Sequence, residues 1–380
     1  MGRQLVVCLD GTNNRFSLQP TNIIRLIRCV SADPAQVLSY YDQGVGTFGL
    51  RETLFEWQKL PSRLCGLALG WGLKRTVGGA YRFLAKHYRD GDQIYLFGFS
   101  RGAYAVRALA ALIDAIGLVP GHEAHLFDYA WSMLQARNAQ GQPAFKLQDS
   151  FKATFGRPVK VHLLGLFDTV KSVGWIYDPL VLPYTASNAL VENVRQALSI
   201  DERRCFFRPN LWQKREGQGT DVRQVWFAGV HSDVGGGYSL DESGPALLAL
   251  RWMLGEARAL GLALDEQGCE RELQLLAAGG PGQLHDSMTW PWKLAEWLPR
   301  RAWSFTLHKR VFAIGIMPPF GEPRPRYIAE GALLHHSVVQ RLESGDYHPV
   351  NLPRLYSVVD DAPFDTAPLV AAAARRRWPD

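Results

Sequence analysis

A serine between two glycines is the strongest chemical signal in the sequence. Ser100 stands in Gly98-Phe99-Ser100-Arg101-Gly102, after an apolar run typical of a strand and before a helical pattern. In such an elbow the glycines allow a sharp turn from strand to helix, which holds the serine hydroxyl above the sheet and the helix amino terminus beneath developing negative charge. The context predicts a nucleophilic serine, whereas the simpler interpretation is a tight turn with a capping serine.

A catalytic serine needs a base beside it and an acid to orient that base, because its hydroxyl is a weak nucleophile. Asp168 ends a strongly apolar run and His231 follows another, so both are predicted at strand ends. The order Ser, Asp, His along the chain is that of α/β-hydrolases. We therefore predict Asp168 as the acid and His231 as the base. His308 and His336 are rival bases, and helix capping is the simpler role for Asp168.

The developing oxyanion would need backbone N–H donors as well. We predict one from Arg101, the residue after the serine, and a second from Gly11 or Thr12 in the polar turn that ends the first strand. Asp10 is expected to organise that turn by bonding to its amides, although a plain Asx turn explains the same residues. Asp233, two residues after the predicted base, is expected to have a supporting role.

Two other functions fit the same residues. Asp10, Asp168, Asp233 and His231 offer oxygen and nitrogen ligands for a metal that would assist phosphoester hydrolysis. Chelator sensitivity together with insensitivity to a serine-directed phosphonate would favour that alternative.

The third hypothesis is a catalytically idle hydrolase fold retained as a lipid-binding or interaction module. Such a module would bind vesicles equally well after Ser100→Ala and would release no product from any ester.

One motif imitates a dinucleotide site. Gly44-Val45-Gly46-Thr47-Phe48-Gly49 matches the G-x-G-x-x-G fingerprint, but the ribose-binding acid expected about twenty positions later is missing. The whole stretch from Trp57 to Arg89 contains no Asp or Glu. We therefore interpret residues 44–49 as an active-site or structural loop, and we expect neither a cofactor nor a bound metal.

Short apolar runs alternate with helical patterns over most of the chain. Near-continuous apolarity, typical of strands buried on both faces of a parallel sheet, predicts strands at 5–9, 37–41, 93–99, 159–167 and 222–230. Apolar residues at helical spacing predict helices at 22–30, 74–88, 101–116, 190–198 and 245–260. The alternation predicts an α/β-hydrolase-like fold with a mostly parallel, doubly wound sheet and helices on both faces. In such sheets the chemistry lies beyond the carboxyl ends of the strands, where Asp10, Ser100, Asp168 and His231 follow.

The strand and helix alternation fades after residue 262. We expect one folded unit, because 380 residues with 47% hydrophobic and 21% charged residues can bury a large core. Residues 1–262 are predicted to form the catalytic core, and residues 263–380 a Trp-rich extension or cap packed on it rather than an independent domain. Trp290, Trp292, Trp297 and Trp303 suit a lipid interface or the lid of an acyl pocket, although core packing is the more usual role of tryptophan.

The net charge and the cysteines limit which partners and which cellular compartment fit this sequence. The net charge of +6 is modest, and we expect no nucleic-acid partner. The basic stretch from Trp57 to Arg89 could face an anionic membrane surface or pair with acids elsewhere.

The five cysteines form no C-x-x-C pair and indicate free thiols in a reducing compartment. The first apolar run is too short for a secretory signal and no run is long enough to span a membrane, so we expect a soluble protein that is cytoplasmic when synthesised.

Taken together, these motifs resemble the DUF2235 domain family, which includes phospholipase effectors of type VI secretion. The matching motifs are Leu9–Asn14, Thr21–Asn22, Tyr41–Gly46, Gly98–Ala103, Phe167–Val170, Ala197–Arg203 and Gly229–Tyr238, with fainter echoes at 285–287 and 336–337. The resemblance implies an α/β-hydrolase core in which Ser100, Asp168 and His231 cleave acyl esters of glycerophospholipids, as in a phospholipase A. It also implies export by type VI secretion, with an immunity or secretion partner.

Overall fold

One eight-stranded sheet organises the part of the chain that the computed structural model describes. That part comprises residues 2–11, 19–44, 62–136, 143–170, 174–175, 178–179, 182–214, 217–279, 282–297, 300–304, 309–317 and 322–361. The strands follow the spatial order β14-β13-β8-β7-β4-β3-β1-β2, and each neighbouring pair is parallel. They are β1 (Gln4–Leu9), β2 (Val37–Asp42), β3 (Gln93–Phe99), β4 (Val161–Phe167), β7 (Val191–Ser199), β8 (Asp221–Phe227), β13 (Ala332–His335) and β14 (Tyr356–Val359).

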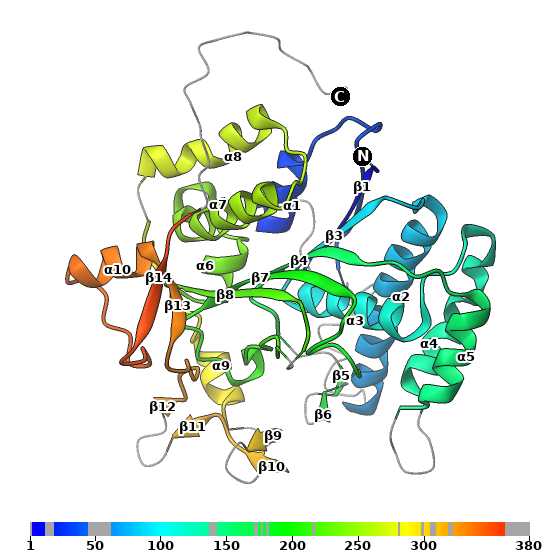
Figure 1. The fold of residues 1–380 in the computed structure, drawn as a ribbon. Helices are drawn as coiled ribbons and strands as arrows, with labels where there is room; N and C mark the ends of the chain where they lie inside the picture. The colour runs from blue at the N-terminus through cyan, green and yellow to red at the C-terminus, as the bar shows by residue number, and fades with distance from the viewer. Residues whose placement is uncertain are drawn as a thin grey trace, which may run out of the picture.

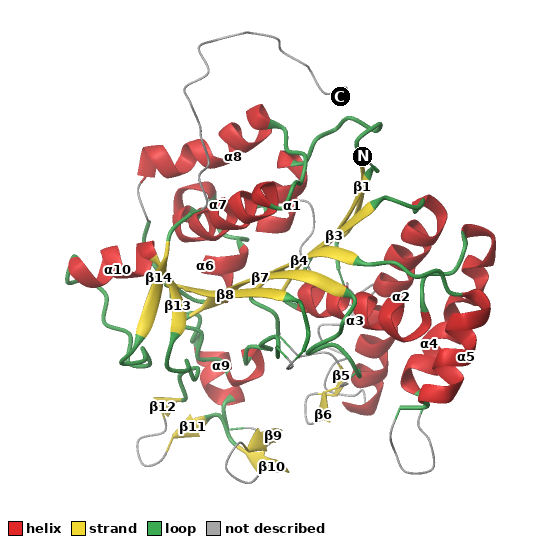
Figure 2. Ribbon diagram, in the orientation of Figure 1, coloured by secondary structure: helices red, strands yellow, loops and turns green. Residues whose placement is uncertain are grey.

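Helices cover both faces of this sheet because its central strands are apolar on both sides (Figure 1). In β1, for example, Val6 and Cys8 enter one core and Val7 enters the other. The first core lies under α1 (Asn22–Cys29), α6 (His231–Gly235), α7 (Gly244–Ala259) and α8 (Glu266–Gly279). The second lies under α2 (Ser62–His87), α3 (Arg101–Ile116), α4 (Phe127–Gln135) and α5 (Phe145–Phe155). The predicted α/β class, with a parallel sheet between two helical layers, is confirmed (Figure 2).

The order of the strands creates a switch point between β1 and β3. From β1 the chain moves outward to β2 through α1, on one face of the sheet. It then returns past β1 to β3 through α2, on the other face. Because helices leave the sheet in opposite directions at this place, the region beyond the carboxyl ends of the two strands is where such sheets usually bind their ligands. Asp10 follows β1 there and Ser100 follows β3.

The predicted helix at 190–198 is wrong, because this segment is the central strand β7. Its apolar residues fall three and four positions apart, which imitates the face of a helix. Two of the intervening polar residues are nevertheless buried in the sheet with partners: Arg195 pairs with Glu256, and Gln196 donates to the Asn210 carbonyl at 3.1 Å. Tertiary pairing of these polar side chains therefore outweighs the local periodicity.

The region after residue 262 adds two strands to the main sheet. Strand β13 pairs with β8 and with β14, so one edge of the sheet is formed by two strands that no alternation of apolar and polar residues predicts. Helix α10 (His336–Glu343) follows β13 directly, and Leu334 and Val338 pack in a small apolar cluster with Trp226 of β8. A boundary at residue 262 stays a prediction.

Several shorter elements lie outside the main sheet. They are α9 (Trp290–Ala295) and the two-stranded pairs of β5 (Gly174–Trp175) with β6 (Asp178–Pro179), β9 (Arg300–Ser304) with β10 (Lys309–Ala313), and β11 (Ile316–Met317) with β12 (Glu322–Pro323). Figure 1 shows α9 and β9 to β12 together, on the side of the sheet away from α7 and α8. Among the described residues, no helix combines the length and apolarity needed to cross a membrane.

Part of the predicted basic stretch lies on α2. Lys74 and Arg82 of this helix both approach Asp128 of α4, at 2.7 and 4.0 Å, and the Arg82 guanidinium lies 4.8 Å from the centre of the Phe127 ring. Residues 57–61 lie outside the described residues. At these two positions the basic side chains therefore have acidic partners within the fold.

Candidate active site

Ser100 occupies a sharp turn between β3 and α3. Its backbone has φ 57° and ψ −120°, in a region that residues other than glycine rarely adopt. Its N–H donates to the Phe167 carbonyl at 3.0 Å, which ties the turn to the end of β4. The flanking glycines are required by close backbone contacts. A Cβ on Gly98 would lie 2.6 Å from the Ala103 backbone, and one on Gly102 would lie 2.1 Å from the Leu9 carbonyl oxygen.

Asp168 and His231 form a buried pair at the same edge of the sheet. Asp168 follows β4 with φ 37°, and the described chain has only one further residue other than glycine and Ser100 at positive φ. His231 begins α6, and its Nδ1 lies 2.6 Å from Asp168 Oδ2. The imidazole stacks on the Phe99 ring at 4.7 Å, beside Ser100 in sequence. Asp168 and His231 are thus in direct contact, and the Ser100 turn lies beside them, joined to the end of β4 through its backbone and to the imidazole through Phe99.

The surroundings favour an ionised Asp168 and a neutral His231. Burial raises the pKa of the Asp168 carboxyl, but the Arg326 guanidinium and the His231 ring outweigh this effect and hold the pKa well below its usual range. Burial lowers the pKa of His231, although Asp168 and Glu202 oppose that shift. A neutral imidazole whose Nδ1 is held by a carboxylate leaves Nε2 able to accept a proton, which is the state required of a general base.

Arg326 also belongs to this group of side chains, although no sequence pattern predicts it. Its guanidinium donates to both Asp168 oxygens, at 2.6 Å to Oδ1 and 2.9 Å to Oδ2, and the side chain is fully buried. It lies 158 positions after Asp168, and no motif surrounds it. An arginine in a Pro-rich segment, with Arg324 two positions before it, carries no functional signal in one sequence, so spacing alone could not have found it.

An aromatic wall stands against the other side of His231. The Phe207 ring meets the imidazole edge to face at 4.9 Å, and Trp292 of α9 meets Phe207 in the same way at 5.5 Å. Arg204 lies 3.8 Å above Phe207 and pairs with both oxygens of the buried Glu202. Glu202 also accepts the His231 N–H at 3.2 Å, so this wall is fixed to the first residue of α6.

The turn after β1 is organised by Asp10. Its Oδ1 accepts the Gly11 N–H at 2.7 Å and its Oδ2 accepts from the Thr21 hydroxyl at 2.6 Å. Gly44 packs against the same turn, since a Cβ there would lie 2.1 Å from the Asp10 carbonyl oxygen. The Gly11 amide is therefore engaged by Asp10 and would have to leave it to bind an oxyanion. The other predicted donor of this turn, Thr12, lies outside the described residues.

Asp233, which is buried, forms a second acid and histidine pair with the partly exposed His285. Its Oδ1 lies 2.6 Å from His285 Nδ1, and its Oδ2 accepts the N–H groups of Val230 and His285. The His285 ring stacks on Tyr238 at 3.7 Å. Asp233 thus fixes the start of α6, and with it His231, to the segment before α9.

The predicted metal ligands do not converge. Asp10 is bound by Thr21 and Gly11, Asp168 by Arg326 and His231, and Asp233 by His285. A cation at Asp168 would also face the Arg326 guanidinium at hydrogen-bonding distance, which is electrostatically unfavourable. The four residues therefore form three separate polar contacts rather than one coordination sphere.

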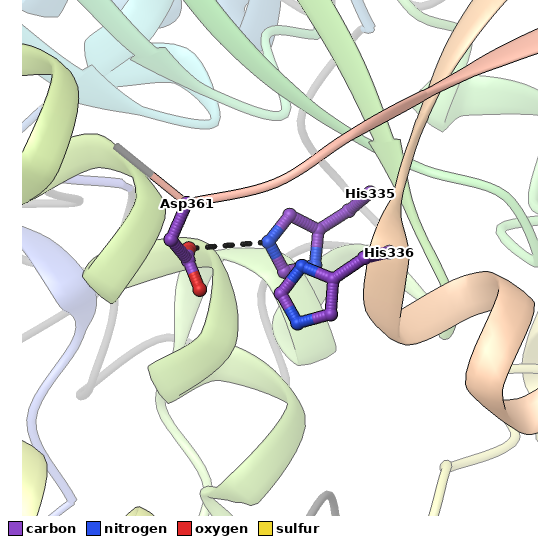
Figure 3. A group of neighbouring side chains, drawn as sticks. All are labelled: His335, His336 and Asp361. Carbon is purple, nitrogen blue, oxygen red and sulfur yellow. Dashed lines mark hydrogen bonds and ion pairs between the residues drawn. The ribbon is translucent and has the colours of Figure 1, made fainter. Parts of the chain in front are cut away.

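A different group of side chains has the composition of a metal site. His335 at the end of β13, His336 at the start of α10 and Asp361 place ligand atoms within 4.8 Å of one another (Figure 3). Asp361 also pairs with Arg251 at 2.6 Å, and His335 Nδ1 caps α10 through the Ser337 N–H. This is where the rival base His336 lies, with Nδ1 3.7 Å from Asp360 rather than beside Asp168. The other rival, His308, lies outside the described residues.

The doubly wound parallel sheet, with the strained serine turn from β3 into α3 and polar side chains beyond the carboxyl ends of its strands, is α/β-hydrolase-like. Within that class, the chain belongs to the family described as the catalytic domain of Tle1-like phospholipase effectors of the type VI secretion system, whose model matches residues 3–256. The match confirms the family resemblance predicted from the motifs. By its description, this is a family of lipid-hydrolysing enzymes.

Known proteins resemble parts of the chain. The uncharacterized protein YEL023C of Saccharomyces cerevisiae is 36% identical over 220 residues, 54% of this chain and 32% of the relative, so the chain spans about a third of that relative's length. An uncharacterized protein from Pseudomonas aeruginosa is 20% identical with a TM-score of 0.41, over 72% of this chain and 48% of that one. The Tle1 effector bound to the VgrG spike of the type 6 secretion system is 16% identical with a TM-score of 0.38, over 77% of this chain and 82% of that one.

Proposed function

We propose that the chain is a serine hydrolase of carboxylic esters that cleaves acyl esters of glycerophospholipids, as a phospholipase A does. The observation that carries the proposal is the buried contact of 2.6 Å between Asp168 and His231, at the edge of the sheet where the strained Ser100 turn lies. The family description supplies the lipid class of the substrate. Ser100 is the proposed nucleophile, His231 the base and Asp168 the orienting acid.

In the proposed mechanism His231 Nε2 accepts the Ser100 hydroxyl proton while Oγ attacks the ester carbonyl carbon. The tetrahedral oxyanion is stabilised by backbone N–H groups, of which Arg101 at the first turn of α3 supplies one. The turn after β1 supplies another once the Gly11 N–H has left Asp10. The imidazolium then gives its proton to the departing lysophospholipid oxygen, and the acyl group stays on Ser100. A water molecule, deprotonated by His231, attacks the acyl carbon and releases the fatty acid and free Ser100.

The products of phospholipid cleavage distinguish this proposal from its rivals. We expect the purified chain, acting on phosphatidylglycerol or phosphatidylethanolamine vesicles, to release fatty acid and lysophospholipid in equal amounts. Mass spectrometry of the extracted lipids checks this. Phosphatidic acid or a phosphorylated head group would instead indicate attack at phosphorus, and vesicle binding with no product would favour an idle lipid-binding module.

Helix α9 is the proposed contact with the lipid surface. Trp292 of this helix packs on Phe207, and Glu296 just beyond it accepts the Cys205 N–H at 2.7 Å, so one side is anchored beside His231. The opposite side exposes Trp290 and Leu294, which are 73% and 61% exposed, and Trp297, two positions after the end of the helix, is 59% exposed. Large apolar side chains of this kind gain free energy by entering a membrane interface. The site would then open toward the bilayer that holds its substrate.

Replacing Trp290, Leu294 and Trp297 together by serine is expected to lower turnover of vesicle phospholipid by about tenfold or more, because each inserted apolar side chain contributes on the order of 1 kcal/mol to membrane binding. Turnover of a short-chain soluble ester should be unchanged, because these side chains point away from the anchored face. Leu147→Ser on α5, another exposed apolar side chain, is the matched control. Equal losses on both substrates would contradict the proposal.

Export by type VI secretion, with an immunity or spike partner, is also proposed, on the strength of the family description. The test compares the amount of the protein in the medium of producing cells with and without a functional secretion system. Equal amounts in both media would exclude this route.

A further inference from the structure

We propose that Arg326 is a positioning residue of the active site, which fixes the Asp168 carboxylate in the orientation that holds His231. The inference rests on the proposed function of Ser100, Asp168 and His231. It adds a residue from outside the segment that the family model matches, which ends at residue 256. Arg326 contacts neither Ser100 nor the imidazole through any described hydrogen bond, so its effect is exerted through Asp168.

Hydrogen bonds from three residues fix the carboxylate of Asp168. Arg326 binds both oxygens in a fork, at 2.6 and 2.9 Å, and the Ser199 N–H donates to Oδ1 at 3.0 Å. His231 Nδ1 takes the remaining position on Oδ2 at 2.6 Å. A bidentate guanidinium contact fixes the plane of a carboxylate as well as its position. Rotation of Asp168 away from His231 would therefore break two charged hydrogen bonds at once.

Arg326 is itself immobilised by the strands of the sheet and the aromatic wall. It donates to the hydroxyl and the carbonyl of Ser199, at 2.7 and 3.0 Å, and to the Phe207 carbonyl. Its own carbonyl accepts from Asn351 at 3.0 Å, and Arg208 donates to the two carbonyls just before it. The guanidinium is thus a fixed group, which suits the positioning of another side chain.

The charges explain why a cation is needed at this place. Asp168 and Arg326 are both fully buried, and an unpaired carboxylate in such surroundings would take up a proton or turn toward water. The neighbouring acid Glu202 is paired with its own arginine, Arg204, at 2.7 Å. Each acid that faces His231 therefore has a dedicated cation. This arrangement keeps Asp168 ionised without giving the imidazole a permanent proton.

The test is the pH dependence of kcat/KM on a soluble ester, measured for Arg326→Met and Arg326→Lys. In the unaltered protein the acid limb of this pH profile, where activity is lost as His231 takes up a proton, should have its midpoint below pH 6.5. The reason is that burial lowers the pKa of His231. Without Arg326, the pair of Asp168 and His231 takes up its first proton at higher pH, so we expect the acid limb of Arg326→Met to rise by about one pH unit or more. Arg326→Lys keeps the charge but not the fork, so its acid limb should stay near the original while kcat falls.

A buried arginine elsewhere in the same sheet provides the control. Arg195 of β7 is 3% exposed and pairs with Glu256 and Asp221, away from the carboxyl edge. Arg195→Met should lower the free energy of unfolding without shifting the acid limb of the kcat/KM profile. If Arg326→Met lowers activity with an unmoved acid limb, as Arg195→Met would, Arg326 is only structural and the inference is overturned. If Arg326→Met does not fold, an unchanged kcat in Arg326→Lys overturns it.

Failure of the proposed function would be recognised separately. If the unaltered protein hydrolyses no ester, the proposed function fails, yet the effect of Arg326 can still be read from the NMR titration of the His231 ring protons. The midpoint of that titration should rise in Arg326→Met and not in Arg195→Met. An unmoved midpoint would overturn the inference about Arg326 whatever the activity of the chain.

Discussion

Ser100→Ala is expected to abolish ester turnover and labelling by a fluorophosphonate while the protein stays folded. In the proposed mechanism the Ser100 Oγ is the atom that bonds to the acyl carbon, so no neighbouring group can replace it. Loss of a serine nucleophile of this kind costs about 10⁴- to 10⁶-fold in kcat. Hydrolysis rates on a soluble ester, with labelling detected by mass spectrometry, check the result.

The strained turn offers a second variant that separates chemistry from stability. Because Ser100 has φ 57°, Ser100→Gly should relieve backbone strain, whereas Ser100→Ala should not. Both variants should be inactive, and the glycine variant should unfold at a temperature no lower than the alanine variant. Undiminished turnover by either would exclude Ser100 as nucleophile. If that turnover were also lost on adding a chelator, the metal-assisted alternative would be favoured.

The carboxyl edge of the sheet was predictable because its signals are local. Ser100 lies between two glycines whose missing side chains the backbone contacts require, and Asp168 and His231 follow the buried strands β4 and β8 of one sheet, with β7 between them. Strand ends are visible in a single sequence since burial on both faces leaves an apolar run that stops abruptly. What remained invisible depends on partners far along the chain.

Arg195 and Arg326 illustrate that limit. Arg195 lies in the middle of a strand, although a charged residue at that position predicts a helix or the protein surface. Its burial is possible because it pairs with Glu256 and Asp221. Arg326 reaches Asp168 across 158 positions through a segment with no periodicity. The short strands β13 and β14 are similar, since four residues each give too short a pattern to recognise. Pairing between distant segments, rather than local propensity, decides all of these.

Asp168→Asn should reduce kcat by about 10⁴-fold, the scale seen when the acid of a triad becomes an amide. The amide cannot hold Nδ1–H of His231 and the Arg326 fork together, because one of its two terminal atoms has become a donor. It also leaves Arg326 buried without an anion, which should lower the free energy of unfolding by about 3 to 5 kcal/mol. Ester kinetics and denaturant unfolding measure the two effects on the same preparation.

The two losses can be separated by a double variant and a matched control. Asp168→Asn with Arg326→Met leaves no unpaired buried charge, so it should recover part of the stability lost in Asp168→Asn and none of the activity. Glu192→Gln breaks a similar contact, 2.9 Å from His162 Nδ1, at the opposite end of β4 and β7. That pair is partly exposed, so its loss should cost about 1 kcal/mol or less and leave kcat unchanged. Recovery of activity with stability in the double variant would mean that Asp168 holds the fold together and takes no part in orienting His231.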